Sequence, residues 1–162
     1  MESLPLKYLG YGITLQEVPN EISLVINVSG CPHKCEGCHS QYLWDYDGYF
    51  IKDDLVSMVQ EYDGMISCVC FMGGEQNLYE LLDHLVYIKS LGLKTCLYTG
   101  CSFIDDLEPL LAYLDWVKIG SYKEKLTVDD NICYGVKLAT SNQKLLKKGV
   151  DFLQIITYNT TC

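Results

Sequence analysis

Cys31, Cys35 and Cys38 are three closely spaced cysteines, arranged as C-x3-C-x2-C. Thiolates are soft ligands that suit Zn²⁺ and iron–sulfur clusters. Three of them do not complete the four-ligand shell of a structural zinc site, whereas a cluster held by three cysteines leaves one iron open to a ligand that is not protein. The spacing therefore predicts a metal centre with an open position at which chemistry can begin.

Two other interpretations of this triple stay open at this point. A zinc knuckle would use the three thiolates with His33 or His39 as the fourth ligand. We expect no catalytic role for these two histidines or for His84. A disulfide framework is less favoured, because three close cysteines cannot all pair among themselves. The other cysteines form no second close triple, and we expect most of them to pack in the core, with Cys101 and Cys162 the two whose reactivity stays open. They are Cys68, Cys70, Cys96, Cys101, Cys133 and Cys162.

A second stretch with a chemical use is Gly73-Gly74-Glu75. Two glycines let the backbone approach a ligand without interference from a Cβ atom. The carboxylate of Glu75 can accept a hydrogen bond from an ammonium group. The alternative is a plain turn between a strand and a helix, with Glu75 exposed to solvent.

The hydrophobic pattern predicts the elements that position these residues. Apolar runs indicate strands at 22–28, 66–72, 94–99, 116–119 and 152–158, with a weaker strand at 11–18. Helical periodicity indicates helices at 51–62 and 77–91, a third at 107–114 and a short one at 142–148, with Asn77 and Glu80 as a capping pair. Residues 123–139 look irregular. Strands that alternate with helices are typical of a parallel α/β sheet.

On that sheet the special stretches fall at one edge. The cysteine loop follows the strand 22–28, Gly73-Gly74-Glu75 follows 66–72, Tyr98-Thr99-Gly100 ends 94–99, and Gly120-Ser121 ends 116–119. Ligands of open α/β sheets bind outside the carboxyl ends of the strands. We therefore expect these stretches to form one site.

The C-x3-C-x2-C motif resembles the cluster motif of the radical S-adenosylmethionine (SAM) enzymes, and Gly73-Gly74-Glu75 resembles their motif for the amino group of SAM, with Gln76 in place of the usual proline. Within that superfamily, residues 12–158 are similar to the activase of anaerobic (class III) ribonucleotide reductase. The stretches that carry this resemblance are Cys35-Glu36-Gly37-Cys38-His39, Leu43-Trp44, Tyr98-Thr99-Gly100 and Ser141-Asn142-Gln143-Lys144 with Leu145. Two stretches depart from it: Ile119-Gly120-Ser121 stands where many relatives have Asp-Gly-Pro, and Lys144 where arginine is common.

The resemblance implies a fold, a chemistry and partners. The fold would be a partial, open (β/α) barrel of about five mainly parallel strands, in a single domain over residues 1–162. A [4Fe-4S] cluster would be held by Cys31, Cys35 and Cys38, and SAM would be cleaved to methionine and a 5′-deoxyadenosyl radical that takes a hydrogen atom from a backbone glycine of the large reductase subunit. The electron donor would be a protein such as a flavodoxin or ferredoxin. The SAM-binding residues would be Gly73, Gly74, Glu75, Thr99 and Asn142. Alternatives are an activase of another glycyl-radical enzyme, such as the pyruvate formate-lyase type, a small-molecule radical SAM enzyme, and a non-enzymatic zinc-binding interaction module.

Composition bears on the kind of partner and on the cellular compartment that we expect for this protein. The 162 residues carry a formal net charge of −9, and all twelve basic residues are lysine. The absence of arginine argues against binding nucleic acid, since phosphate clamps and base readers are mostly arginine. No apolar run is long enough to span a membrane and the first ten residues do not look like a signal peptide, so we expect a protein of the reducing cytoplasm. The stretch 42–50, which includes Trp44, is rich in aromatic residues. These side chains could form a hydrophobic wall around the cluster, pack beneath the cysteine loop, or form an apolar surface that binds a large substrate.

Overall fold

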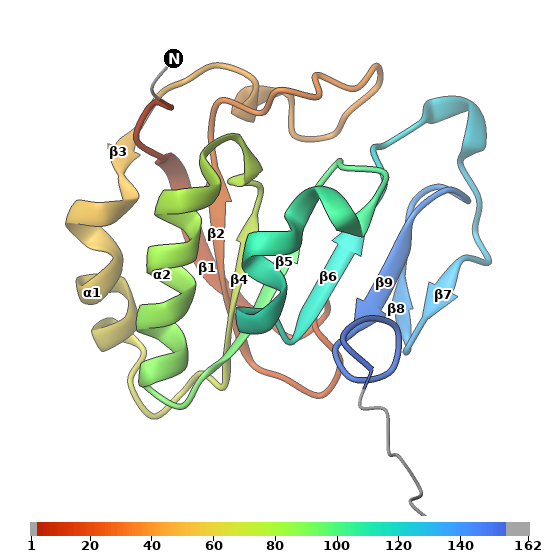
Figure 1. The fold of residues 1–162 in the computed structure, drawn as a ribbon. Coiled ribbons are helices and arrows are strands. Elements are labelled where there is room, and N and C mark those ends of the chain that lie inside the picture. Colours follow the sequence, from red (N-terminus) through yellow and green to blue (C-terminus); the bar gives the residue numbers. More distant parts are fainter. Residues whose placement is uncertain (1–2, 155–162) are drawn as a thin grey trace, which may run out of the picture.

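The computed structural model describes residues 3–154, and within them a seven-stranded mixed sheet forms the centre of the molecule (Figure 1). Its strand order is β3-β1-β2-β4-β5-β6-β9. The four central strands, β2, β4, β5 and β6, are parallel to one another. Strands β1, β3 and β9 pair antiparallel at the two sides. The strands are β1 (Lys7–Thr14), β2 (Ser23–Val28), β3 (Tyr49–Phe50), β4 (Cys68–Met72), β5 (Lys94–Tyr98), β6 (Trp116–Ile119) and β9 (Lys144–Lys147), with a separate hairpin of β7 (Ile132–Cys133) and β8 (Val136–Lys137).

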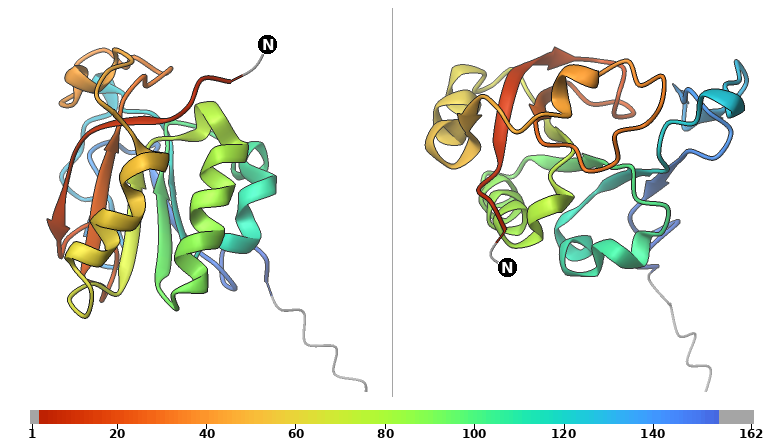
Figure 2. Two further views of the ribbon diagram at one scale, coloured as in Figure 1. Left: turned by 90° about the vertical axis from the view of Figure 1, so that its left-hand side faces the viewer. Right: turned by 90° about the horizontal axis from the view of Figure 1, so that it is seen from above.

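The longer helices all cover one face of this sheet (Figure 2). They are α1 (Ile51–Glu61), α2 (Leu78–Ser90) and a 3-10 helix at Ile104–Tyr113. Helix α2 begins as predicted, because the Asn77 side chain accepts a hydrogen bond from the Glu80 backbone N–H at 3.1 Å. Three single-turn 3-10 helices occupy loops, at Gln41–Leu43, Glu75–Asn77 and Glu124–Leu126.

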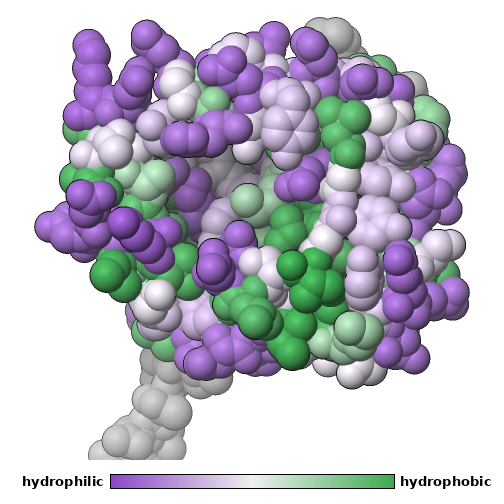
Figure 3. All heavy atoms as spheres, turned by 180° about the vertical axis from the view of Figure 1, so that it is seen from behind, coloured by the Kyte–Doolittle hydropathy of each residue, from purple (hydrophilic) through white to green (hydrophobic). Residues whose placement is uncertain are grey.

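The two faces of the sheet bury different side chains. Alternate residues of each strand point to opposite faces. On the helix-covered face the core is aliphatic and aromatic, with Phe71 at its centre. On the opposite face Cys68, Cys70 and Cys96 lie with Trp116 in a second buried cluster. Figure 3 views the molecule from that opposite side and shows a hollow with an apolar patch beside it.

Several predicted elements differ from the structure in extent or type. The first strand is β1, Lys7–Thr14, rather than 11–18, and its start is set by antiparallel pairing with β2 and β3. The third helix is a 3-10 helix, since Pro109 inside it has no N–H to donate to an α-helical ladder. The stretch 123–139 contains the β7–β8 hairpin.

The short helix predicted at 142–148 is wrong. Residues Lys144–Lys147 form β9, which pairs antiparallel with β6 and completes the hydrogen bonds of its open edge. Leu145 packs on the cysteine-bearing face and Leu146 on the helix-covered face, so the pattern that suggested a helix is that of a strand buried on two sides. A last strand was predicted at 152–158. In the structure Phe152 makes only an isolated bridge with Lys148, and residues 155–158 lie outside the described part of the chain.

The fold class is therefore a mixed α/β domain with a mostly parallel central sheet. The prediction of mainly parallel strands is confirmed for β2, β4, β5 and β6. The antiparallel strands at the two sides of the sheet were not predicted. The partial-barrel assignment stays a prediction. In the range 3–154, none of the helices has the length and apolar character needed to cross a lipid bilayer.

Candidate metal centre

The loop that carries Cys31, Cys35 and Cys38 leaves β2 and returns toward β3 across the carboxyl edge of the parallel strands (Figures 1 and 2). Its base is held by the backbone, because the Gly30 N–H donates to the Asp45 carbonyl at 3.1 Å and the Cys31 N–H to the Leu43 carbonyl at 2.9 Å. The two ends of the loop are thus tied together just outside the sheet.

The loop forms one wall of a cavity of about 180 Å³. The other walls come from the ends of the four parallel strands. The four stretches that the sequence predicted to lie at one edge of the sheet therefore do line one cavity. Lining residues used below are Cys31, His33, Cys35, Cys38, Trp44, Gly73, Glu75, Tyr98, Thr99, Gly100, Lys118 and Gln143.

The three loop cysteines are free and only partly buried, so their sulfur atoms are accessible from the cavity. The Ser40 N–H donates to Cys38 Sγ at 3.3 Å. Burial raises the pKa of the Cys35 thiol, while the backbone N–H of Tyr122 acts in the opposite direction. A bound metal would supply the positive charge that ionises these thiols.

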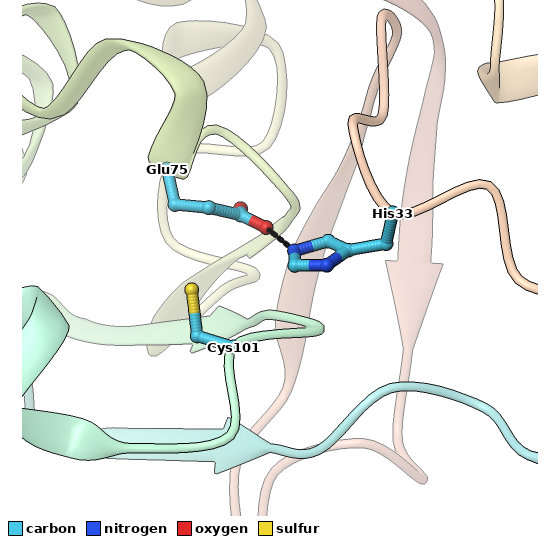
Figure 4. A group of neighbouring side chains, drawn as sticks. All are labelled: His33, Glu75 and Cys101. Atoms are coloured by element: carbon cyan, nitrogen blue, oxygen red, sulfur yellow. Dashed lines mark hydrogen bonds and ion pairs between the residues drawn. The ribbon is translucent and has the colours of Figure 1, made fainter.

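The spread of the three sulfur atoms is informative about which metal they could hold. Ligands of one tetrahedral zinc ion, with Zn–S near 2.3 Å, lie about 3.8 Å from one another. Within residues 3–154, the one group of three metal-ligating atoms that all lie within 4.8 Å of each other is His33, Glu75 and Cys101 (Figure 4). The three loop thiols do not form such a group, so as they stand they are not gathered around a single zinc ion.

The turn that follows β4 requires both of its glycines. Gly73 and Gly74 have φ of +102° and +121°, a region that residues with a Cβ rarely adopt. Gln76, which stands where the resembling enzymes have proline, braces this turn: its side-chain amide donates to the Ser29 carbonyl at 3.0 Å and accepts from the Gly74 N–H at 3.2 Å. The turn is thereby joined to the base of the cysteine loop.

Glu75 points from this turn toward the cysteine loop and meets His33 (Figure 4). His33 Nε2 lies 2.7 Å from Glu75 Oε1, and the Glu75 side chain is only 8% exposed. Burial by itself raises the pKa of Glu75, but the hydrogen bond with His33, together with contributions from the Glu75 backbone N–H and the Thr99 side chain, outweighs burial and leaves the pKa below its usual value. The same hydrogen bond raises the pKa of His33. The alternative of a solvent-exposed Glu75 is thus wrong.

His33 is a functional candidate that the sequence singled out only as an optional fourth ligand of a zinc knuckle. The glycine of Tyr98-Thr99-Gly100 leaves the space that the His33 ring occupies, but the sequence alone does not show that these two residues are neighbours. A Cβ atom built on Gly100 would lie 2.6 Å from the His33 ring, so only glycine allows the imidazole to reach Glu75.

The two other predicted SAM contacts are placed differently. Thr99 is buried and lines the cavity. The Asn142 side chain donates to the Ser121 carbonyl at 2.9 Å and accepts from the Thr140 hydroxyl at 2.7 Å, and it is the neighbouring Gln143 that lines the cavity. A contact of Asn142 with SAM stays a prediction.

The family model of the 4Fe-4S single cluster domain matches residues 19–146, which include the whole cysteine loop and every wall of the cavity. The chain belongs to this family. The family occurs in radical SAM-type proteins. A 4Fe-4S cluster domain is accordingly the functional core of the chain. A search of curated proteins finds no match to the sequence.

The residues around the cavity fit the cluster of this 4Fe-4S domain and a polar ligand beside it. Cys31, Cys35 and Cys38 are the residues that could hold the cluster, because they are three soft donors on one cavity wall. Two buried polar atoms of the same cavity, Trp44 Nε1 and Glu75 Oε2, have no hydrogen-bond partner among the described residues. A donor and an acceptor left unpaired in one cavity indicate that a polar ligand completes the site.

Proposed function

We propose that this protein is a radical SAM enzyme, the activase that generates the glycyl radical of an anaerobic ribonucleotide reductase. Its substrates would be SAM, an electron from a protein such as a flavodoxin or ferredoxin, and a backbone glycine of the large reductase subunit. The reducing cytoplasm, in which the thiols stay available for metal, is the compartment that suits this chemistry.

The chemistry of the proposal is supplied by the cofactor. When bound, a [4Fe-4S] cluster would supply the electron for cleavage of SAM to methionine and a 5′-deoxyadenosyl radical. This radical would take the hydrogen atom from the glycine Cα, which would leave 5′-deoxyadenosine and a glycyl radical. The protein binds and orients the reactants. Cys31, Cys35 and Cys38 would hold the cluster, and the carboxylate of Glu75 would accept a hydrogen bond from the SAM ammonium group.

The observation that carries the proposal is the meeting of two motifs at one cavity. The cysteine loop and the Gly73-Gly74-Glu75 turn are about forty residues apart in the sequence, and yet they are joined by the His33–Glu75 contact of 2.7 Å and by the Gln76–Ser29 hydrogen bond. Glu75 Oε2 has no partner within the described range, so one oxygen is free for an ammonium group. An isolated metal-binding knuckle would have no use for this buried acceptor.

A large protein substrate is supported by what surrounds the cavity. The face of the sheet that carries Tyr98 and Lys118 is the one that the longer helices leave uncovered. Tyr42 and Tyr46, which follow the cysteine loop, are 58% and 39% exposed. Exposed aromatic side chains of this kind are common anchors of protein interfaces.

The test is to mix the anaerobically reconstituted protein with SAM, a reductant and candidate large reductase subunits, and to record electron paramagnetic resonance spectra. We expect a glycyl-radical signal that is absent with the Cys35→Ala protein and absent when the radical-bearing glycine of the reductase is replaced by alanine. A signal only with a reductase of another class, such as pyruvate formate-lyase, would reassign the partner. Intact SAM after incubation with cluster-loaded protein and reductant would contradict the proposal as a whole.

A further inference from the structure

Cys101 lies beside the cavity, but the proposed function gives it no role. Together with His33 and Glu75 it forms a group in which one ligand atom of each residue lies within 4.8 Å of the others (Figure 4). The three residues come from three separate segments, namely the cysteine loop, the turn after β4 and the loop after β5. Ligand atoms of one tetrahedral metal ion lie about 3.3–3.8 Å apart, so small movements would let this nitrogen, oxygen and sulfur share one ion.

The backbone holds two of these donors in place. The Cys101 N–H donates to the Thr99 hydroxyl at 3.0 Å, and the Cys101 carbonyl accepts from the Gly120 N–H at 2.8 Å. The His33 ring fits into this corner only because residue 100 is glycine, as its close approach to Gly100 shows. Donors that are held before a ligand arrives lose less conformational entropy when it binds.

The carboxylate of Glu75 provides a second observation that points to a ligand. The Glu75 side chain is only 8% exposed, and its Oε1 lies 2.7 Å from His33 Nε2. Its Oε2 is buried and has no hydrogen-bond partner among the described residues. A buried acceptor without a partner requires an explanation, and an ion bound beside it would supply one.

The donor set favours Zn²⁺ among the common metal ions. Mg²⁺ and Ca²⁺ prefer sites made of oxygen atoms, whereas imidazole, carboxylate and thiolate are all ordinary zinc ligands. Three protein ligands leave a fourth position for water, as in many zinc sites that are not purely structural. The Cys101 thiolate and the Glu75 carboxylate together would balance the charge of the ion, and binding would release the thiol proton and the proton held between His33 and Glu75.

We propose that His33, Glu75 and Cys101 form a second, mononuclear metal site, which binds Zn²⁺ and excludes SAM while it is occupied. The metal site itself stands on these three residues. The exclusion of SAM rests on the proposed function, because it requires Glu75 to accept a hydrogen bond from the SAM ammonium group. A zinc ion on Glu75 takes up this acceptor and places positive charge where the ammonium would lie. Zinc would therefore compete with SAM.

A competing interpretation gives these residues purely structural roles. Cys101 packs against the core of the helix-covered face, and the His33–Glu75 hydrogen bond fastens the cysteine loop to the sheet edge. The two interpretations differ in what they predict for protein whose loop thiols already hold a cluster. A structural role predicts no uptake of zinc by such protein, whereas the proposed site predicts one further ion per chain.

The experiment dialyses anaerobically reconstituted, cluster-loaded protein against Zn²⁺ and measures zinc content, iron content and X-ray absorption at the zinc edge. We expect one zinc ion per chain at unchanged iron content. Its neighbours should be a single sulfur at about 2.3 Å and nitrogen or oxygen atoms at about 2.0–2.1 Å. Zinc that had replaced iron on the cysteine loop would instead show three sulfur neighbours and a loss of iron.

Cys101→Ala separates the zinc site from the SAM site, since Cys101 does not line the cavity. Loss of a hydrogen bond that merely supports a metal ligand costs roughly 10- to 100-fold in metal affinity, and loss of the Cys101 ligand should cost at least as much. SAM affinity without zinc should stay at the wild-type level. Cys133→Ala is the matched control, because Cys133 is also a half-buried free cysteine but lies on β7, and it should bind zinc as the wild type does.

Competition is measured on the same samples. Zinc should lower the SAM affinity of the wild type, SAM should lower its zinc affinity by the same factor, and Cys101→Ala should lose this coupling. Cys101→Ser carries the same test if the alanine variant does not fold.

Absence of zinc uptake by the cluster-loaded wild type, three sulfur neighbours, or equal uptake by Cys101→Ala would overturn the metal site. Zinc that binds at this site without changing SAM affinity would overturn the exclusion. If the wild type binds zinc here but does not bind SAM at all, the proposed function fails, the exclusion fails with it, and the metal site stands.

Discussion

Two sets of three cysteines lie in this molecule, one on the loop outside the sheet and one inside it. Cys31, Cys35 and Cys38 are partly exposed and line the cavity. Cys68, Cys70 and Cys96 are fully buried in neighbouring strands β4 and β5. The residue type is the same, and its surroundings decide what it can do.

Burial makes the sheet cysteines poor ligands and poor nucleophiles. It raises the pKa of Cys68 and that of Cys96 well above the ordinary value, and neighbouring thiols add to the effect. Cys68 and Cys96 therefore stay protonated, and all three buried cysteines pack as small apolar side chains. The loop cysteines line an open cavity, and a bound metal would supply the positive charge that ionises their thiols. Changes in the loop should alter function, and changes in the sheet should alter stability.

The largest expected difference is in metal content. Cys35→Ala should remove the cluster and SAM cleavage together, because two thiolates do not replace the three-ligand set. Cys68→Ala should keep the iron content and the cleavage rate close to those of the wild type. Iron and sulfide analysis after anaerobic reconstitution measures both variants. Retention of the cluster in Cys35→Ala with its loss in Cys68→Ala would reverse the assignment of the two sets.

The next difference concerns the turn that faces the loop. Glu75→Gln should keep its iron and weaken SAM binding about ten- to a hundredfold, since the charge-assisted hydrogen bond to the ammonium group is lost. Glu36→Gln serves as the control, because Glu36 is an exposed carboxylate of the cysteine loop itself. Equilibrium binding to the reconstituted proteins gives both affinities. Unchanged SAM affinity in a folded Glu75→Gln protein would remove this turn from the binding site.

A third difference separates the inside of the cavity from its outer surface. Tyr42→Ala should leave SAM cleavage with an artificial reductant unchanged and weaken the complex with the reductase, by about 2 kcal/mol if Tyr42 is an interface anchor. Trp44→Ala, which removes a wall of the cavity, should impair SAM binding as well. Titration of the glycyl-radical yield against reductase concentration distinguishes the two. Equal yields from Tyr42→Ala and the wild type at limiting reductase would place the interface elsewhere.

The smallest effect is expected within the sheet. Cys70→Ser introduces a hydroxyl group into an apolar cluster, at a cost of about 1–3 kcal/mol in the free energy of unfolding. Cys133→Ser, at a half-buried position beside the same cluster, should cost less. Denaturant unfolding under reducing conditions measures both. A stable Cys70→Ser protein that has lost its iron would show that the sheet cysteines belong to the metal centre.

The sequence was sufficient to predict those parts of the fold that depend on local pattern. The parallel strands β2, β4, β5 and β6 and the cap at Asn77 follow from hydrophobic runs and capping chemistry. The same patterns brought the cysteine loop and the Gly73-Gly74-Glu75 turn to one edge. Side-chain alternation also explains why the cysteines of β4 are buried on one face.

What could not be predicted depends on contacts between distant segments. Residues 142–148 were predicted to form a short helix, and only the pairing of Lys144–Lys147 with β6 makes this run a strand. The His33–Glu75 contact joins residues 42 positions apart and carries no local signal. Cys101 was one of two cysteines whose reactivity stayed open in the sequence, and its place beside His33 and Glu75 is visible only once the strands are side by side.

The most direct test of the account is the electron paramagnetic resonance spectrum of the anaerobically reconstituted, reduced protein with and without SAM. The account predicts about four iron atoms per chain, a reduced-cluster signal that changes shape when SAM is added, and loss of that signal in Cys31→Ala, Cys35→Ala and Cys38→Ala. A colourless protein that contains zinc, or a cluster signal that SAM leaves unchanged, would contradict it.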